Sequence, residues 1–207
     1  MLLTICQTGE IVLRQSSRQL TSSEIQTEPI QDLIASMFET MRAAPGVGLA
    51  APQIGVPLQV AVIEDRQAYI EKLSNEHSTE RLRVAVAPHV IINPRLTLEP
   101  AAAEPSGINQ PGEVEFFEGC LSLPGFTAIV PRALSVRVDC LNEYAEPVTI
   151  HARGWYARIL QHEIDHLHGI LYIDRMLTRT FMGRENFERY WKDMPVAECR
   201  KLLTLVP

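Results

Sequence analysis

The stretch Gln161-His162-Glu163-Ile164-Asp165-His166 carries the residue types that could do chemistry. His162 and His166 are four residues apart, so on an α-helix they lie on one face, one turn apart. Two imidazoles placed in this way can bind one metal ion, and Glu163 can reach a metal-bound water. The alternative is a solvated helix with two chance histidines, which the three matched positions disfavour. The motif therefore predicts a metal-dependent enzyme, but it gives neither the third ligand nor the substrate.

Three sources of a third ligand are open, since two histidines alone would hold a metal weakly. Metzincin proteases use a histidine three residues after a glycine; here Gly169 is present but the ligand position is Tyr172, which counts against that class. A glutamate from a later helix is available as Glu185 or Glu188, although both lie among charged residues. Cys120 is the remaining candidate, because a Cys-His-His set leaves one coordination position open for water.

Chain length and composition indicate one ordinary globular domain. The chain has 207 residues, enough for one domain with a sizeable core and marginal for two. A hydrophobic content of 46% and a charged content of 21% argue against disorder. The net charge of −6 gives no basic footprint for a nucleic-acid partner, and no apolar run has the length of a membrane span. We expect a single catalytic domain over residues 1–207, with no specific nucleic-acid partner and no membrane partner.

The cysteines bear on the cellular compartment. The chain has four, Cys6, Cys120, Cys140 and Cys199, which are scattered and form no C-x-x-C pair. The start of the chain lacks the basic region and the long apolar core of a secretory signal. A disulfide framework is not expected without export, so we expect a cytoplasmic protein whose cysteines are by default small buried residues.

The first half of the chain predicts one amphipathic helix and several strands. Apolar residues at three- and four-residue steps between Ile30 and Met41 predict a helix with one buried stripe, preceded by Thr27 as its cap and ending at 43–45. The stretch 46–55 is dominated by small residues, which permit close backbone approach; it lacks the Lys-Ser/Thr of a phosphate loop. An alternation from Leu58 to Ile63 predicts a strand. The polar residues 64–83 predict a loop or short helix.

The second half predicts further strands and the histidine-bearing helix. Strands are expected at 84–86 and 89–98, broken by Pro88 and Pro94, followed by a loop over 99–113. Further strands are expected at 127–130, 134–140 and 148–152, the last two joined by a turn at 142–147. The helix runs from Trp155 to Leu167 and is ended by Gly169. A short apolar piece at 170–173 follows, and 178–207 is a tail or helix of uncertain role. These elements indicate an α+β fold.

Three blocks of sequence, in this order, resemble the signature blocks of the peptide deformylase family. They are 46–53 (Gly-Val-Gly-Leu-Ala-Ala-Pro-Gln), 118–122 (Glu-Gly-Cys-Leu-Ser) and 161–169 (Gln-His-Glu-Ile-Asp-His-Leu-His-Gly). The resemblance covers about residues 8–177, and three ordered blocks are hard to reach by chance. It implies an α+β fold in which antiparallel sheets surround a central metal-binding H-E-x-x-H helix, with the N-terminal amphipathic helix packed outside.

The resemblance also implies roles for individual residues. Cys120, His162 and His166 are similar to the family's metal ligands, and Glu163 is similar to its general acid/base. Gln53 and the backbone N–H of Leu121 resemble the donors that stabilise the oxyanion, and Gly48 stands where the family's backbone contacts substrate.

The substrate and the metal also come from the resemblance. The expected reaction is removal of the N-formyl group from the N-terminal formyl-methionine of newly made polypeptides, releasing formate, and the expected partners are N-formylmethionyl nascent peptides at the ribosome exit. A thiolate with two imidazoles suits Fe²⁺, Zn²⁺, Ni²⁺ or Co²⁺; the family's usual metal is Fe²⁺, so iron is expected first and zinc second. The sequence does not give the oligomeric state.

The helix upstream of His162 predicts part of a pocket. Trp155, Arg158 and Ile159 lie seven, four and three residues before that histidine, near the same helix face. We expect Trp155 and Ile159 to wall the pocket for the methionine side chain, with plain core residues as the equal alternative. Arg158 is expected to pair with a carboxylate such as Glu118 or to lie at the pocket rim. Trp155, Arg158, the long 64–115 connection and the Gly125-Phe126 pair resemble the organellar-type branch of the family.

Overall fold

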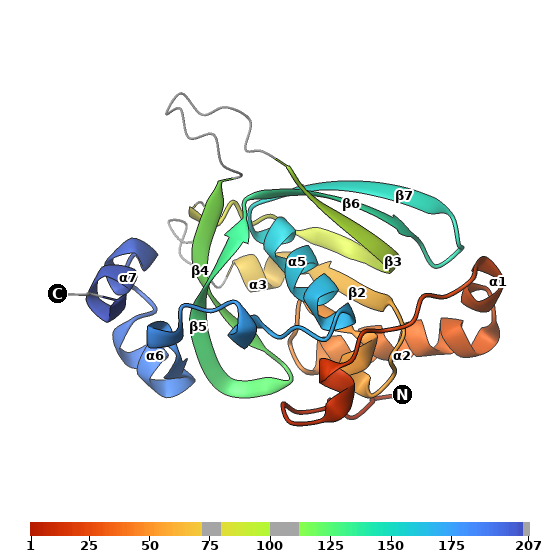
Figure 1. Ribbon diagram of the computed structural model, residues 1–207, viewed down its shortest axis with the longest axis horizontal. Helices are drawn as coiled ribbons and strands as arrows, with labels where there is room; N and C mark the ends of the chain where they lie inside the picture. Colours follow the sequence, from red (N-terminus) through yellow and green to blue (C-terminus); the bar gives the residue numbers. More distant parts are fainter. Residues whose placement is uncertain (72–79, 100–111, 205–207) are drawn as a thin grey trace.

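Two antiparallel sheets form the framework of the computed structural model, which describes residues 1–71, 80–99 and 112–204 (Figure 1). The larger sheet has the strand order β1 (Gly48–Ala50), β2 (Val60–Asp65), β3 (Val86–Glu99), β6 (Ser135–Leu141) and β7 (Pro147–Arg153). The smaller sheet has the order β4 (Glu113–Cys120), β5 (Leu123–Ala133) and β8 (Met182–Gly183). All the paired strands are antiparallel, so the fold is α+β as the sequence predicts.

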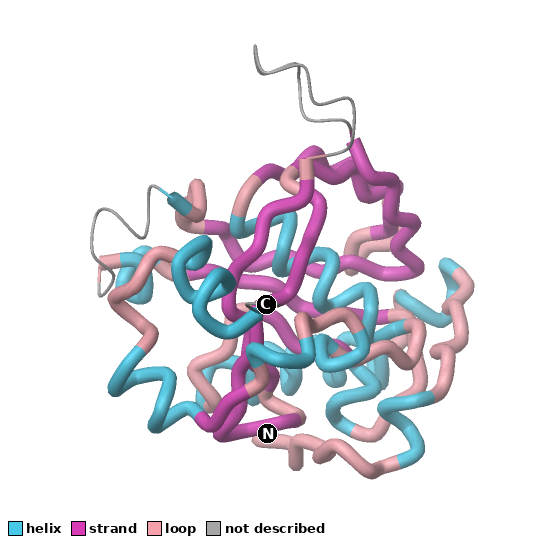
Figure 2. The backbone as a smooth tube through the Cα atoms, turned by 60° about the vertical axis from the view of Figure 1, so that its left-hand side comes forward, coloured by secondary structure: helices cyan, strands magenta, loops and turns pink. Residues whose placement is uncertain are grey.

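The helices lie on three sides of these sheets. Helix α5 (Trp155–Leu167) lies between the two sheets, α2 (Glu28–Ala43) packs on β1 and β2, and α6 (Arg184–Tyr190) and α7 (Val196–Thr204) lie outside the smaller sheet (Figures 1 and 2). The short elements are α1 (Ser22–Ile25), α3 (Gln67–Ile70) and four 3₁₀ turns, η1 (Ile11–Arg14), η2 (Ala51–Ile54), η3 (Tyr172–Asp174) and η4 (Thr178–Thr180).

Strand β2 explains how the two main helices are placed. Successive side chains of a strand point to opposite faces of the sheet. Ala61 and Ile63 pack into the core cluster that contains α5, while Val60 and Val62 pack into the cluster that contains α2. The strand is therefore apolar at consecutive positions, because it is covered on both faces.

The prolines of β3 correct one prediction. The sequence predicts two strands interrupted at Pro88 and Pro94, but β3 is continuous from Val86 to Glu99. Pro94 lies in the irregularity of the β3–β6 register between Ile92 and Arg95, next to Asn93 with a φ of 52°. A proline at such a bulge removes no hydrogen bond from the regular ladder. The break expected at Pro94 is thus a bend within one strand.

Other element boundaries differ by smaller amounts. The small-residue stretch forms β1 and the 3₁₀ turn η2, and the strand predicted at 127–130 is the middle of the longer β5. The polar stretch 64–83 contains α3, and the apolar piece 170–173 leads into η3. Helix α5 covers the predicted range, and the turn at 142–147 joins β6 to β7. Most of the loop predicted at 99–113 lies outside the described residues.

The C-terminal stretch is packed on the smaller sheet. Phe187 of α6 lies against Phe117 of β4, with ring centroids 4.7 Å apart, and Val196 and Cys199 of α7 are buried in the same cluster. Strand β8 pairs with β5 at Phe126 and Thr127. The C-terminal stretch therefore packs against the smaller sheet.

Candidate metal centre and cleft

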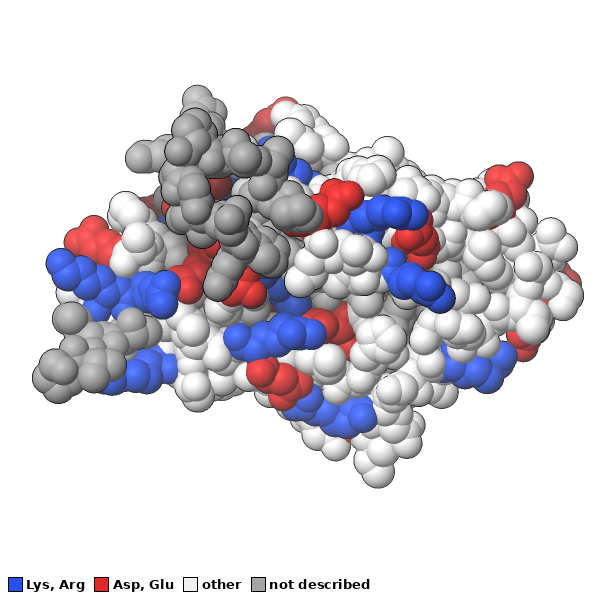
Figure 3. Space-filling view, turned by 45° about the horizontal axis from the view of Figure 1, so that its top comes forward, with Lys and Arg blue, Asp and Glu red and all other residues white. Residues whose placement is uncertain are grey.

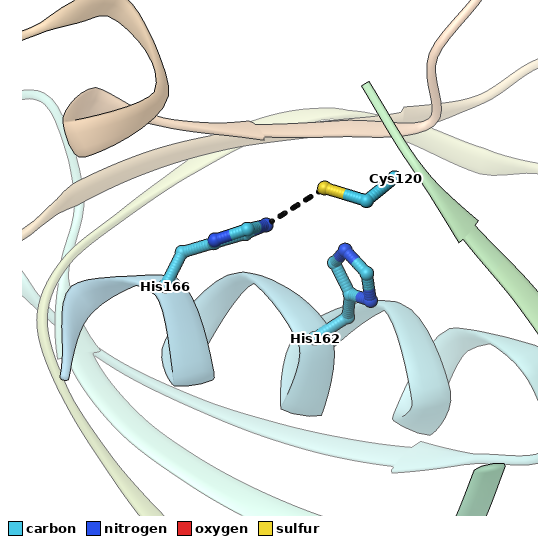
Figure 4. Close-up of side chains that lie close together, drawn as sticks. All are labelled: Cys120, His162 and His166. Atoms are coloured by element: carbon cyan, nitrogen blue, oxygen red, sulfur yellow. Dashed lines mark hydrogen bonds between the residues drawn. The ribbon is translucent and has the colours of Figure 1, made fainter. Parts of the chain in front are cut away.

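Cys120, His162 and His166 meet where β4 ends beside α5. Cys120 is the last residue of β4, and the two histidines are one turn apart on α5. Their ligand atoms all lie within 4.8 Å of one another, and Cys120 Sγ is 3.3 Å from His166 Nε2 (Figure 4). All three side chains point toward one another in Figure 4. The donors therefore have the types and the spacing that a metal ion held by one thiolate and two imidazoles requires.

The other third-ligand candidates do not join the cluster of Cys120, His162 and His166. Within the ranges 1–71, 80–99 and 112–204, no other group of three metal-ligating side chains meets this distance criterion. Glu185 and Glu188 are exposed on α6. Tyr172, at the metzincin ligand position, is buried, and its ring stacks with that of His162 at 6.3 Å. The geometry thus favours Cys120 among the three alternatives.

The charge state of the donors suits a cation. Burial disfavours a thiolate, but the imidazoles of His166 and His162 outweigh it and hold the pKa of Cys120 well below its ordinary value. Burial likewise disfavours an imidazolium, but Cys120 and Glu118 raise the pKa of His162 well above its ordinary value. The Ser122 N–H also donates to Cys120 Sγ at 3.4 Å. A divalent metal replaces protons in such a thiolate–imidazolium cluster.

Glu118 orients His162 from the strand that carries Cys120. Glu118 Oε2 is 3.0 Å from His162 Nδ1, which leaves Nε2 of that ring for a metal. Glu118 also accepts from Arg132 Nε at 3.0 Å and from Arg158 Nη1 at 2.6 Å. Burial alone would raise the pKa of Glu118, but Arg132 and His162 lower it far below its ordinary value. The predicted pairing of Arg158 with Glu118 is confirmed.

The ion pairs continue to the far end of α5, where Arg175 joins them from the surface. Arg132 also donates to Asp165, whose carboxylate accepts two hydrogen bonds from Arg175 at 2.6 and 2.7 Å. Arg158 completes its contacts on the carbonyl oxygens of Val130 and Val114, at 2.8 and 2.6 Å. The helix that carries both histidines is thereby fixed to β4 and β5 by charged hydrogen bonds, which are stronger than neutral ones.

Glu163 is buried with one free oxygen. Its side chain is 4% exposed, and Oε2 has no hydrogen-bond partner in the described part of the chain. Burial raises the pKa of its carboxyl group. Gly48 packs directly against it, since a Cβ at Gly48 would lie 2.2 Å from Glu163 Oε1. The carboxylate therefore occupies the space that a side chain at position 48 would fill.

Gln53 and Leu121 both lie near the Cys120 thiolate. Gln53 Oε1 accepts from the Ala50 N–H at 2.8 Å, so its Nε2 faces Cys120 Sγ at 3.5 Å and Ser122 Oγ at 3.3 Å. Leu121 is in the turn between β4 and β5 and lines the same cleft as Gln53. Both residues therefore line the cleft at the candidate metal centre, and their roles as donors stay predictions.

A cleft of about 710 Å³ opens at this centre. Gly48, Trp155 and Ile159 line it together with Cys120 and His162, so the structure brings the predicted pocket residues to one cavity. Whether Trp155 and Ile159 hold a methionine side chain stays a prediction. Further lining residues are Arg81 and Arg83 before β3, and Arg184, Phe187, Glu188, Lys192 and Asp193 on and after α6. Except for Glu188, which the sequence offers as an alternative third ligand, the sequence assigns them no role in the site.

No pattern in the sequence predicts that several residues of the site belong to it. Arg132 and Asp165 belong to the buried ion pairs and Arg175 pairs with Asp165 from the surface, yet their partners are 10 to 33 residues away along the chain. Asp165 is inside the H-E-x-x-H segment, but the sequence assigns it no role. Its burial at 7% exposure follows from the smaller sheet, which covers α5 on a second side.

The surface charges and the length of the helices are relevant to nucleic-acid and membrane partners. Basic and acidic side chains are interspersed on the face drawn in Figure 3. Among the described residues, no helix combines the length and the apolar character needed to cross a bilayer.

Comparison with protein families gives one match over most of the chain. The sequence model of the family described as polypeptide deformylase matches residues 2–181. The chain is 43% identical to peptide deformylase 1A, chloroplastic, of Solanum lycopersicum over 199 residues, which cover 96% of the chain and 66% of that protein. It therefore spans slightly less than two thirds of the length of that relative. It is 39% identical to peptide deformylase 1 of Streptomyces coelicolor, covering 91% of the chain and 80% of that protein.

Solved structures give the same fold. The chain resembles a Met-Ala-Ser-bound class I type b peptide deformylase from Acinetobacter baumannii with a TM-score of 0.71 and 29% identity, over 85% of this chain and 99% of that one. It resembles a peptide deformylase from Thermotoga maritima with a TM-score of 0.67 and 30% identity, over 85% and 98% of the two chains.

Proposed function

The chain belongs to the peptide deformylase family, and we propose that it removes the N-formyl group from N-terminal formyl-methionine of newly made polypeptides. The observation that carries the proposal is the meeting of Cys120, His162 and His166 beside the buried carboxylate of Glu163. Three donors leave one coordination position for water, as a catalytic site needs. The Acinetobacter baumannii relative binds Met-Ala-Ser, a peptide of the kind this reaction leaves.

We propose that α5 is the metal-binding helix and that the metal is Fe²⁺, with Zn²⁺, Ni²⁺ or Co²⁺ as substitutes. A thiolate and two imidazoles form a donor set that these ions share. Cys120, His162 and His166 would hold a divalent ion there, and such an ion would supply an activated water and polarise a carbonyl group. Glu118 and Arg132 keep His162 in the orientation that binding needs.

The chain's own residues then handle the proton and the developing charge. Glu163 Oε2 takes the proton of the attacking water and delivers it to the departing amine, so formate and a free amino terminus are released. Its raised pKa suits a group that must both accept and donate near neutral pH. Gln53 Nε2 and the Leu121 N–H donate to the carbonyl oxygen as it becomes negative, and one such donor is worth about 3 kcal/mol of the barrier.

The cleft would hold the peptide end. Gly48 brings backbone close to the reacting group, and Trp155 and Ile159 wall the methionine side chain. The partners are N-formylmethionyl peptides leaving the ribosome. The cytoplasmic location expected from the cysteines stays a prediction, and the tomato relative is named as chloroplastic.

The decisive experiment is a formate-release assay on formyl-Met peptides with protein prepared without oxygen, because air oxidises both Fe²⁺ and an exposed thiolate. Wild-type protein should release formate. Glu163→Ala should retain the metal and lose turnover, and Cys120→Ala should lose the metal. Full activity and metal content in Cys120→Ala would instead favour a metalloprotease-type site that uses Glu185 or Glu188.

A further inference from the structure

Arg81 is held against one wall of the cleft by aromatic side chains. Its guanidinium carbon lies 4.9 Å from the centroid of the Trp155 ring and 5.7 Å from that of Phe116. The Arg81 carbonyl accepts the Trp155 N–H at 2.9 Å. Gly154 permits this approach, since a Cβ there would lie 2.7 Å from the Arg81 carbonyl oxygen. The guanidinium is therefore fixed on the first residue of α5.

The other arginines of the cleft have carboxylate partners. Arg83 donates twice to Asp65, at 2.7 and 2.9 Å. Arg158 pairs with Glu118, and Arg184 lies 3.5 Å from Glu188.

Arg81 makes no ion pair within the described ranges, and its Nε, buried in the wall, has no acceptor there. Burial and the nearby Arg83 lower the pKa of Arg81, and the opposing effect of Glu80 is smaller, so no carboxylate fully offsets the burial of this cation. Because Arg81 is only partly buried and lines the cleft, its remaining N–H groups are available to a ligand.

We propose that Arg81 binds the carboxylate of an acidic side chain in the first residues after the methionine of the substrate, an inference that rests on the proposed function. A guanidinium stacked on an aromatic ring is pre-organised, and its forked donors match a carboxylate. The first turn of α5 adds positive potential beside Trp155. The cleft thus selects among peptides by charge in addition to the methionine side chain.

Formyl-Met tripeptide amides that differ only by Asp or Asn at the second or the third position test this proposal. Wild-type protein should favour an Asp peptide over its Asn counterpart by roughly five- to twentyfold in kcat/KM at low salt. Arg81→Gln should abolish the preference, Arg81→Lys should restore part of it, and Arg81→Glu should favour Lys peptides. Arg184→Gln is the matched control, because its guanidinium already has Glu188, and it should keep the preference.

Each other outcome counts against the subsite. Equal rates for Asp and Asn peptides, an equal loss for all peptides in Arg81→Gln, or loss of the preference in Arg184→Gln would show that Arg81 only packs on Trp155. A preference for peptides with a free C-terminal carboxylate over their amides, without one for Asp, would assign Arg81 to the chain end instead.

Failure of the proposed deformylase function can be distinguished from failure of the Arg81 proposal. If no formyl peptide releases formate, calorimetric binding of Met-Asp-Ala amide and Met-Asn-Ala amide tests Arg81 alone. Tighter binding of the Asp peptide that Arg81→Gln removes would support the subsite, and equal binding would overturn it.

Discussion

Gly48→Ala should disable the reaction through Glu163 while leaving the fold intact. The new methyl carbon would lie 2.2 Å from Glu163 Oε1, 2.6 Å from Cδ and 2.7 Å from Cγ, whereas real Cβ atoms essentially never come within 3.0 Å of a heavy atom. The carboxylate oxygen must therefore withdraw by about 0.8 Å or more, and a displacement of about 1 Å can cost 100-fold in rate. We expect kcat/KM for a formyl-Met peptide to fall about 100-fold.

The surroundings of Glu163 determine whether its side chain can move aside without the loss of activity. The side chain is 4% exposed and packs against Gly48, so a change of rotamer would have to move it into the cleft that it lines. Overpacking of this kind costs about 1–3 kcal/mol of stability. The two ligand histidines point toward Cys120 on the metal side (Figure 4), so metal content should stay near one per chain.

Formate release, metal analysis and urea unfolding measure the three effects. Gly183→Ala is the control, since a Cβ there meets nothing within 4 Å, and its activity should be unchanged. In a Glu163→Ala background, Gly48→Ala should cost little more, because the group that it displaces is gone. Activity within threefold of wild type in the single variant, or losses that multiply in the double variant, would refute the argument that position 48 acts through Glu163.

Three further predictions concern the ion pairs and the metal. Glu118→Gln leaves the buried Arg158 without a carboxylate and removes one of the two carboxylates that pair with Arg132, so the free energy of unfolding in urea should fall by about 3–5 kcal/mol; a loss under about 1 kcal/mol would contradict this. A chelator should lower the Tm of wild-type protein and of Cys140→Ala but leave Cys120→Ala unchanged, because only a metal bound to the native state adds stability. The hydrogen bond from Arg42 lowers the pKa of Glu64, so that pair stabilises the fold above the unfolded pKa and ceases to do so as pH falls. Arg42→Gln should therefore cost about 0.5–1 kcal/mol near pH 7 and almost nothing near pH 3, as measured by urea unfolding at both pH values.

Patterns among neighbouring residues were sufficient to predict α5 and the three blocks that form the site. The helix bounds follow from apolar spacing and the glycine at position 169, both of which are properties of neighbouring residues. The blocks around Gln53, Cys120 and His162 contain the side chains that meet at the cleft. The third ligand stayed open from the residues alone, because a choice between Cys120 and a glutamate depends on which strand passes the helix.

Features that depend on the pairing of distant strands could not be predicted from neighbouring residues. Pro94 reads as a strand break, since the tolerance for a proline at that point comes from the register shift against β6. Burial of Asp165 depends on Arg132, 33 residues before it. The contact of Gly48 with Glu163 joins the first and the third block across the cleft, and no spacing rule predicts it.

The buried ion pairs link the stability of α5 with the geometry of the metal site. A short helix with Arg158, Glu163, Asp165 and His166 all buried is costly unless each charge has a partner. Glu118 and Arg132 supply partners from β4 and β5, the hairpin that also carries Cys120. The contacts that compensate the buried charge therefore also set the distance between the thiolate and the two imidazoles. It follows that substitutions of Arg175, Asp165 or Arg132 should weaken metal affinity and stability together, whereas substitutions of Arg81 should change substrate preference and leave metal affinity unaltered.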